Sequence, residues 1–187
     1  MGLEQLCQVD GVGESLAAYI YTAGRCYEKF YQLRMTPDVR IHEYNTDSFV
    51  EYVREAYANV DREVFDLYAI NDNSEIIMCK RFSQDSLFHV RVSPEEIGDF
   101  IMKNHAIGLV MVHNHPLGDP KPSESDNDVT MKCQLMCSLH NTLLCDHVIY
   151  APNGVFSYYQ HGLLKKISEQ YSVQNVLSRK LHWEEEQ

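Results

Sequence analysis

A continuous apolar run at residues 108–112, GLVMV, leads directly into His113-Asn114-His115. Such a run is typical of a central strand that is buried on both faces of a sheet. Side-chain direction repeats every two residues along a strand, so the two histidines point the same way and can hold one ion together. A loop rich in Pro and Gly follows, and then a predicted helix. A strand end, a loop and a helix start are a common place for a site in an open α/β sheet.

The two histidines predict a metal site if a third ligand lies nearby. Tetrahedral zinc in a catalytic site takes three protein ligands and leaves one position for water. Asp126 supplies the third ligand if the loop brings the helix back toward the strand end. The loop is stiff because Pro116, Pro120 and Pro122 each fix their own φ and restrict the residue before them.

Each part of this pattern also has a purely structural interpretation. Two histidines at a strand end occur as ordinary surface residues with satisfied hydrogen bonds. Ser123 and Asp126 lie three residues apart at a predicted helix start, where Ser-x-x-Asp is by itself a capping arrangement. The whole pattern rarely arises by chance: His-x-His, seven residues, Ser, two residues, Asp. We therefore favour a zinc site held by His113, His115 and Asp126.

The order of these residues resembles the JAMM metal motif of the JAB/MPN domain. Three segments resemble the bacterial RadC family more closely: HNHPLGDPKPSESD at 113–126, CDHVI at 145–149 and GLL at 162–164. The resemblance covers residues 45–165. Leu117 departs from it, because the family usually has a small residue there, but this is not a ligand position.

The resemblance implies an α/β fold of the JAB/MPN type, which is a cytidine-deaminase-like mixed β-sheet flanked by helices. It implies that the two histidines and Asp126 bind zinc and that Ser123 helps to hold the tetrahedral intermediate. It also implies a glutamate on an earlier strand that polarises the attacking water. By motif position this is Glu63, at the start of the segment EVFDL. Glu95 and Glu96 compete for the role, but capping of a helix explains them.

These groups form a coherent mechanism. Zinc lowers the pKa of bound water to about 7. A carboxylate within hydrogen-bond reach takes a proton from the water and returns it to the leaving group. The hydroxyl of Ser123 can donate to the oxyanion that forms. The predicted reaction is therefore attack of water on an amide-like carbonyl, which means hydrolysis of a peptide or isopeptide bond.

Periodicity and turn residues predict the elements around this centre. Ser93-Pro94-Glu95-Glu96 forms a capping box, and Thr46 or Asp47 caps an earlier helix. The predicted helices cover residue 14 to about 33, 47–58, 94–105, and a segment whose apolar face is Val129, Cys133, Met136 and Leu139. The predicted strands cover 63–70 and 75–82 (a hairpin), 87–92, 108–112, 144–150 and 155–158.

Three parts are expected along the chain. Residues 1–36 form a small helical segment that resembles part of a helix-hairpin-helix, followed by a linker at 37–46. Residues 45–165 form the metallohydrolase domain, and 166–187 form an acidic helical tail that frays at 183–186. In the first part, the backbone of Gly11 and Gly13 is the candidate contact for a DNA phosphate. A plain helix-packing turn explains these glycines equally well.

His147 is predicted to lie on a strand near the site. The favoured interpretation is a core histidine that is hydrogen-bonded to its neighbours. The alternative is a residue that supports one of the metal ligands from behind. The sequence leaves both interpretations open.

Charge and composition limit the partners and the compartment. The net charge of −11 argues against a broad nucleic-acid surface, which needs a basic stripe, so we expect at most weak DNA contact through the N-terminal part. No apolar run is long enough to cross a bilayer, and the N-terminus lacks the features of an export signal. The six cysteines are scattered, which predicts reduced core thiols in a cytoplasmic protein.

The sequence therefore predicts a zinc-dependent hydrolase of the JAMM type. One alternative is a DNA-associated module in DNA repair or mobile-element biology that lacks peptidase activity. Another is a catalytically silent scaffold, which the complete set of candidate residues disfavours. The substrate is not predicted, because specificity lies in loops and partner surfaces.

Overall fold

The computed structural model describes residues 2–35, 43–83 and 92–181. The chain divides into two compact units, Met1–Pro37 and Asp38–Gln187. The predicted strand at 87–92 falls almost entirely outside the described residues, as do most of the predicted linker and the acidic end at 183–186. Among the described residues, no helix combines the length and the apolar character that crossing a membrane requires.

The smaller unit consists of a short helix, α1 (Leu3–Cys7), and a long one, α2 (Glu14–Met35). The long helix begins at the predicted residue. Among the side chains of this unit that the structure describes, the buried apolar ones are Leu6 on α1 and Ala17 on α2. The turn between the helices passes through Gly11 at φ 80°, a left-handed conformation that glycine adopts without a steric penalty.

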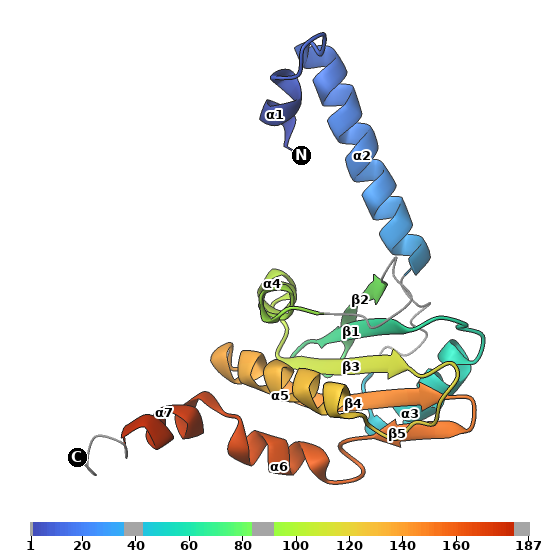
Figure 1. Cartoon of the computed structure of the whole chain (residues 1–187), viewed down its shortest axis with the longest axis vertical. Helices are drawn as coiled ribbons and strands as arrows, with labels where there is room; N and C mark the ends of the chain where they lie inside the picture. Colours follow the sequence, from blue (N-terminus) through green and yellow to red (C-terminus); the bar gives the residue numbers. More distant parts are fainter. Residues whose placement is uncertain (1, 36–42, 84–91, 182–187) are drawn as a thin grey trace. The chain divides into compact units, whose positions relative to one another are not determined.

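The larger unit is built on one mixed sheet of five strands in the order β2-β1-β3-β4-β5 (Figure 1). The pairing of β3 with β4 is parallel, and the other three pairings are antiparallel. The strands are β1 (Val64–Ile70), β2 (Ile76–Ser83), β3 (Gly108–Asn114), β4 (Leu143–Ala151) and β5 (Gly154–Ser157). This is the mixed, helix-flanked sheet that the sequence predicts, with β3 at its centre.

Helices cover both faces of this sheet (Figure 1). One core packs helix α3 (Thr46–Tyr57) against one face. The other core packs α4 (Pro94–Asn104) and α5 (Glu124–Leu139) against the opposite face. All seven residues of β3 are buried, which confirms the prediction of a strand covered on both faces. Two further helices follow β5: α6 (Leu163–Gln170) and α7 (Val173–Leu181).

The start of α3 differs from its prediction. Neither Thr46 nor Asp47 is the N-cap, because Asn45 takes that position. Its Oδ1 accepts hydrogen bonds from the backbone N–H groups of Asp47 at 3.1 Å and Ser48 at 3.4 Å. Asn is as good an N-cap as Asp and a better one than Thr. The first of these three adjacent residues therefore caps the helix. The capping box predicted for α4 is confirmed, with Ser93 as cap and Glu96 closing it.

The predicted apolar face of α5 is partly wrong. Cys133 is fully buried as expected, but Leu139 is 58% exposed. Thr130 and Cys137 are fully buried in addition to Cys133. A polar residue is buried here because the hydroxyl of Thr130 finds hydrogen-bond partners inside the protein.

The cysteines do not all lie in the core. Each of the six is a free thiol, and Cys79, Cys133 and Cys137 are buried as predicted. Cys7 and Cys26, in the smaller unit, are exposed, so the prediction of core thiols is wrong for them. Large apolar side chains of that unit are exposed as well, among them Leu16, Tyr19 and Ile20 on α2.

Candidate metal centre

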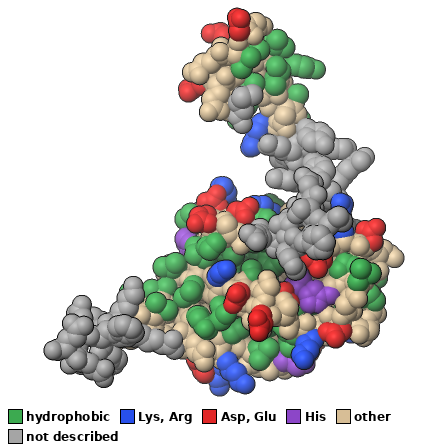
Figure 2. Space-filling view, viewed as in Figure 1, with side chains coloured by type: hydrophobic (Ala, Val, Ile, Leu, Met, Phe, Trp, Pro, Cys, Tyr) green, Lys and Arg blue, Asp and Glu red, His purple; other side chains and the backbone are tan. Residues whose placement is uncertain are grey.

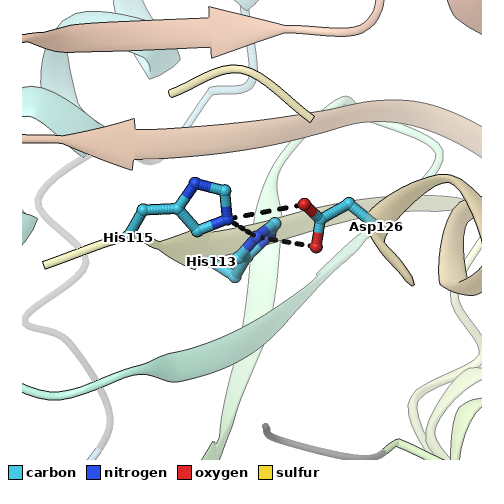
Figure 3. Close-up of side chains that lie close together, drawn as sticks. All are labelled: His113, His115 and Asp126. Atoms are coloured by element: carbon cyan, nitrogen blue, oxygen red, sulfur yellow. Dashed lines mark hydrogen bonds and ion pairs between the residues drawn. The ribbon is translucent and has the colours of Figure 1, made fainter. Parts of the chain in front are cut away.

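The two histidines of the motif and Asp126 converge on one point at the end of β3 (Figure 3). The Nε2 atoms of His113 and His115 lie 2.9 Å apart. Nε2 of His113 is 3.1 Å from Oδ1 of Asp126, and Nε2 of His115 is 3.4 Å from Oδ2. Among the residues that the structure describes, these three are the group of potential ligands whose donor atoms cluster within 4.8 Å of one another.

The strand and the loop together aim the two imidazoles. His113 belongs to β3, and His115 follows the strand by one residue. The backbone N–H of His115 still donates to the carbonyl of Tyr150 on β4 at 2.7 Å, so the extended conformation continues past the end of the strand. Side chains two residues apart therefore emerge on the same face. That face is the one covered by α5, whose first turn carries Asp126.

Asp126 belongs to a helix cap and to the cluster at the same time. Oδ2 of Asp126 accepts hydrogen bonds from the backbone N–H and from the hydroxyl of Ser123, both at 2.7 Å. The backbone N–H of Asp126 donates to Oγ of Ser123 at 3.2 Å, which completes the capping box. The same carboxylate presents one oxygen to each histidine (Figure 3). The cap and the candidate ligand are therefore compatible interpretations of one residue.

The charges in this cluster depend strongly on one another. Burial alone would raise the pKa of Asp126, but hydrogen bonds with His113 and His115 hold it well below its usual range. The hydrogen bond to Asp126 raises the pKa of His115, although burial acts in the opposite direction. A carboxylate that faces two imidazoles thus favours a positive charge between them.

The donor set fits a zinc ion. Two imidazole nitrogens and one carboxylate oxygen form a known ligand set for catalytic zinc. Metal–ligand distances of about 2.0–2.1 Å give a tetrahedron with edges of about 3.3 Å. The three ligand separations of 2.9, 3.1 and 3.4 Å lie around that value. The side chains of His115 and Asp126 are 19% and 13% exposed, so solvent reaches the cluster.

Figure 2 shows the surface of the larger unit, on which histidine side chains reach solvent beside acidic groups. The candidate proton carrier, Glu63, lies immediately before β1 and is exposed. Phe65 pairs with His113 across β1 and β3, and their rings stack at 6.3 Å. The charge of Glu63 is close enough to help raise the pKa of His115, after the larger effects of Asp126, burial and Asp119. The competitor Glu96 is occupied by its capping box.

Asn114 is a residue that the sequence reasoning missed. Its side chain is fully buried on the face of the sheet opposite the two histidines. Oδ1 accepts from the backbone N–H of Val64 at 2.8 Å, and Nδ2 donates to the carbonyls of Arg62 at 2.9 Å and Val60 at 3.2 Å. These bonds bracket Glu63. The alternation of side chains along β3 puts Asn114 on the face opposite the two histidines, and that face is also buried. A buried amide needs hydrogen-bond partners, so the sequence contained a signal that Asn114 is structurally important.

His147 on β4 is completely buried and contacts His113 directly. Its Nε2 lies 2.8 Å from Nδ1 of His113, and its Nδ1 lies 2.7 Å from Oγ1 of Thr130. Its ring stacks on Tyr158 at 4.8 Å, and burial lowers its pKa well below the usual value. The two interpretations of His147 therefore describe one residue that is hydrogen-bonded in the core and contacts a candidate ligand. Thr130 is a second residue that the sequence reasoning missed.

The remaining candidates lie in the smaller unit. Gly11 lies in the turn between α1 and α2, and Gly13 immediately precedes α2. A Cβ added at either residue would meet nothing within 4 Å, so space does not require a glycine at these positions. The left-handed φ explains Gly11 as a turn residue. A DNA contact at these glycines stays a prediction.

The sheet, its covering helices and the His-His-Asp cluster define an α/β domain of the JAB/MPN type with a candidate metal site. Residues 44–163 match the family of the RadC-like JAB domain, and the chain belongs to this family.

Related proteins are similar in sequence to this chain over most of its length. The UPF0758 protein SPO0054 of Ruegeria pomeroyi is 27% identical over 162 residues, which is 87% of this chain and 71% of that protein. The UPF0758 protein A1S_2918 of Acinetobacter baumannii is 25% identical over 88% of this chain and 69% of that protein. The UPF0758 protein CA_C1241 of Clostridium acetobutylicum is 27% identical over 88% and 71%.

Proposed function

We propose that this domain is a zinc-dependent hydrolase of the JAMM type that adds water to the carbonyl of a peptide or isopeptide bond. The observation that carries the proposal is the convergence of two imidazole nitrogens and one carboxylate at the end of a buried strand. A zinc ion held by His113, His115 and Asp126 would supply a Lewis acid and lower the pKa of water to about 7.

Glu63 is the proposed proton carrier. It is exposed, and its charge is close enough to act on His115. A carboxylate near the metal can take a proton from the attacking water and return it to the leaving amine. Its neighbours on both sides are fixed, since Asn114 binds the backbone of Arg62 and Val64. A fixed backbone limits where the carboxylate can reach, which favours one orientation toward the water.

Ser123 has two proposed roles. Its hydroxyl donates to Asp126 at 2.7 Å and so orients the candidate ligand. When the hydroxyl turns away, the backbone N–H of Ser123 still binds the same carboxylate oxygen at 2.7 Å. The hydroxyl is then free to donate to the oxyanion of the tetrahedral intermediate.

Metal analysis combined with a peptidase assay tests this function. The purified full chain and the variant Glu63→Gln are each analysed for zinc and assayed on a panel of peptides and isopeptide-linked substrates. We expect about one zinc per chain in both proteins, and a loss of activity of at least 100-fold in the variant, in the range typical of a general base.

Glu95→Gln is the matched control, because Glu95 is also an exposed glutamate but lies in the first turn of α4. It should retain both zinc and activity. Hydrolysis that survives in Glu63→Gln would remove Glu63 from the mechanism. Zinc-loaded wild-type protein that cleaves no member of the panel would contradict the proposed reaction and leave the metal site intact.

A further inference from the structure

We propose that Thr130 and His147 are positioning residues that hold a proton on Nδ1 of His113 and so leave its Nε2 bare for a metal ion. The proposal rests on the proposed function in one respect, which is that His113 binds a metal. It assigns a tautomer to each imidazole of the network, and these tautomers can be measured with or without catalysis.

The Thr130 hydroxyl has a single proton and two neighbours that could accept it. Oγ1 of Thr130 lies 2.5 Å from the carbonyl oxygen of Asp126 and 2.7 Å from Nδ1 of His147. A carbonyl oxygen can only accept, and two oxygens this close repel each other unless a proton lies between them. The hydroxyl therefore donates to the carbonyl of Asp126. It follows that Nδ1 of His147 is the donor to Thr130.

The tautomer of His147 determines the tautomer of His113. His147 is completely buried, and its two described hydrogen-bond partners, Thr130 and His113, are both uncharged when His113 is a neutral ligand. A second proton would place an uncompensated charge in the interior, so the ring is neutral. With its proton on Nδ1, His147 accepts through Nε2. The donor of the 2.8 Å bond must then be Nδ1–H of His113.

Both histidine ligand candidates have the same tautomer. Nδ1 of His115 lies 2.7 Å from the carbonyl oxygen of Asp119, which can only accept. Neutral His115 therefore also carries its proton on Nδ1. Both Nε2 atoms present lone pairs to each other and to the carboxylate of Asp126, at 2.9 to 3.4 Å. Three converging lone pairs repel one another until a proton or a metal ion lies between them, and the hydrogen bonds of Asp126 with the imidazoles correspond to the protonated state.

The network closes into a ring of contacts that begins and ends on Asp126. The carbonyl of Asp126 accepts from Thr130, Thr130 accepts from His147, His147 accepts from His113, and His113 faces the carboxylate of Asp126. Helix α5 and strands β3 and β4 each contribute a member. Tyr158 stacks on His147 at an interplanar angle of 14° and fixes the plane of that ring. The orientation of the metal ligand is therefore set from the core.

The variants Thr130→Val and Thr130→Ser test this proposal in the full chain. Valine has nearly the shape of threonine but lacks the hydroxyl, whereas serine keeps the hydroxyl. Without an acceptor, the proton of His147 moves to Nε2 and forces His113 to carry its own proton on the metal-binding nitrogen. We expect Thr130→Val to weaken zinc affinity about 10–100-fold, measured by competition with a chelator, and Thr130→Ser to stay near the wild type.

The nitrogen chemical shifts of the wild-type histidines provide a second test that needs no substitution. In the metal-free protein we expect a protonated Nδ1 and a bare Nε2 on His147. A proton on Nε2 of His147 would overturn the proposal, even if Thr130→Val fails to fold. Equal zinc affinity of folded Thr130→Val and the wild type would also overturn it.

The two proposals can fail separately. Wild-type protein that binds zinc with the assigned tautomers but cleaves nothing contradicts only the proposed hydrolase function. Active protein whose zinc affinity does not respond to Thr130→Val contradicts only the positioning network.

Discussion

At the scale of single residues, the cap that Ser123 forms on α5 and its proposed role in chemistry can be separated by experiment. Ser123→Ala removes the side-chain cap of α5 and the hydroxyl that binds Asp126. We expect a loss of about 1 kcal/mol in the free energy of unfolding, measured by chemical denaturation. We expect a larger loss in kcat/KM, because the oxyanion loses a donor that is worth about 100-fold or more.

Ser123→Thr is the control, since threonine keeps a hydroxyl at the cap. It should retain most of the stability and part of the activity. If Ser123→Ala lowers stability but leaves kcat/KM at the wild-type value, the serine is only a cap.

Asn114 provides the second prediction at this scale. Asn114→Ala removes three hydrogen bonds and leaves the N–H of Val64 buried without its partner. We expect a destabilisation of at least about 1–3 kcal/mol by chemical denaturation. If Asn114 also positions Glu63, the folded variant should keep its zinc and lose kcat.

A folded Asn114→Ala variant with wild-type kcat would contradict the positioning of Glu63 through its backbone. Asn71→Ala is a suitable control, because Asn71 also bonds to backbone N–H groups but lies in the hairpin turn of β1 and β2. It should lower stability and leave kcat unchanged.

At the scale of elements, the end of α4 carries a strained residue. His105 is the C-cap and adopts a left-handed conformation with φ 49°. Only glycine reaches this conformation without a penalty from its Cβ. We expect His105→Gly to raise the free energy of unfolding by about 0.5–1 kcal/mol, because the relief of strain exceeds the added entropy of the unfolded chain.

Met102→Gly is the control within the same helix. Met102 is exposed and helical, so glycine should cost about 1 kcal/mol there. Destabilisation by His105→Gly as large as that by Met102→Gly would contradict the strain.

The predictability of each element depends on how local its causes are. The apolar run of β3 and the capping box of α4 are written in consecutive residues, and both were predicted from the sequence. The cap of α3 was missed because Asn45, Thr46 and Asp47 are adjacent and each can serve as a cap. The buried face of α5 was missed because Thr130 is buried through a partner on β4.

The residues of the site also divide into those that a local pattern reveals and those that depend on distant partners. The metal-ligand candidates were found because their spacing is a local pattern. The partners of Asn114 and His113 could not be read in this way, since Val64 is 50 residues from Asn114 and His147 is 34 residues from His113. Contacts of this kind depend on which strands become neighbours. The sequence places the residues on strands but does not by itself give the order of the strands.

At the scale of the whole molecule, the order of the strands assembles the site. β3 lies between β1 and β4, so the residue before β1, the two histidines at the end of β3 and His147 on β4 come together on the face covered by α5. A buried carboxyl group on β4 joins this strand to β5 and to the turn that follows β5. Buried Asp146 accepts hydrogen bonds from Ser157 at 2.5 Å and from the backbone N–H of Tyr159 at 2.9 Å.

The raised pKa of this carboxyl group predicts that the free energy of unfolding depends on pH. Burial raises the pKa of Asp146 from 3.8 to about 6, although hydrogen bonds from Ser157 and Tyr159 oppose the shift. Because the folded pKa lies above the unfolded one, the contribution of Asp146 to stability is complete below pH 3.8 and is lost as the pH rises through 6.

Asp146→Asn should therefore gain stability relative to the wild type as the pH rises from 4 to 7, by up to about 3 kcal/mol. Denaturation curves of both proteins across this range measure the difference. A difference that is constant with pH, or that falls as the pH rises, would contradict the raised pKa.

The central claim is that two histidines and one aspartate of this domain hold a zinc ion. X-ray absorption at the zinc edge of the purified full chain tests it most directly. The spectrum should show a four-coordinate zinc with nitrogen and oxygen ligands at about 2.0–2.1 Å and two imidazoles, and Asp126→Asn should weaken binding. Zinc bound through sulfur at about 2.3 Å, or zinc that Asp126→Asn leaves unchanged, would contradict the assignment.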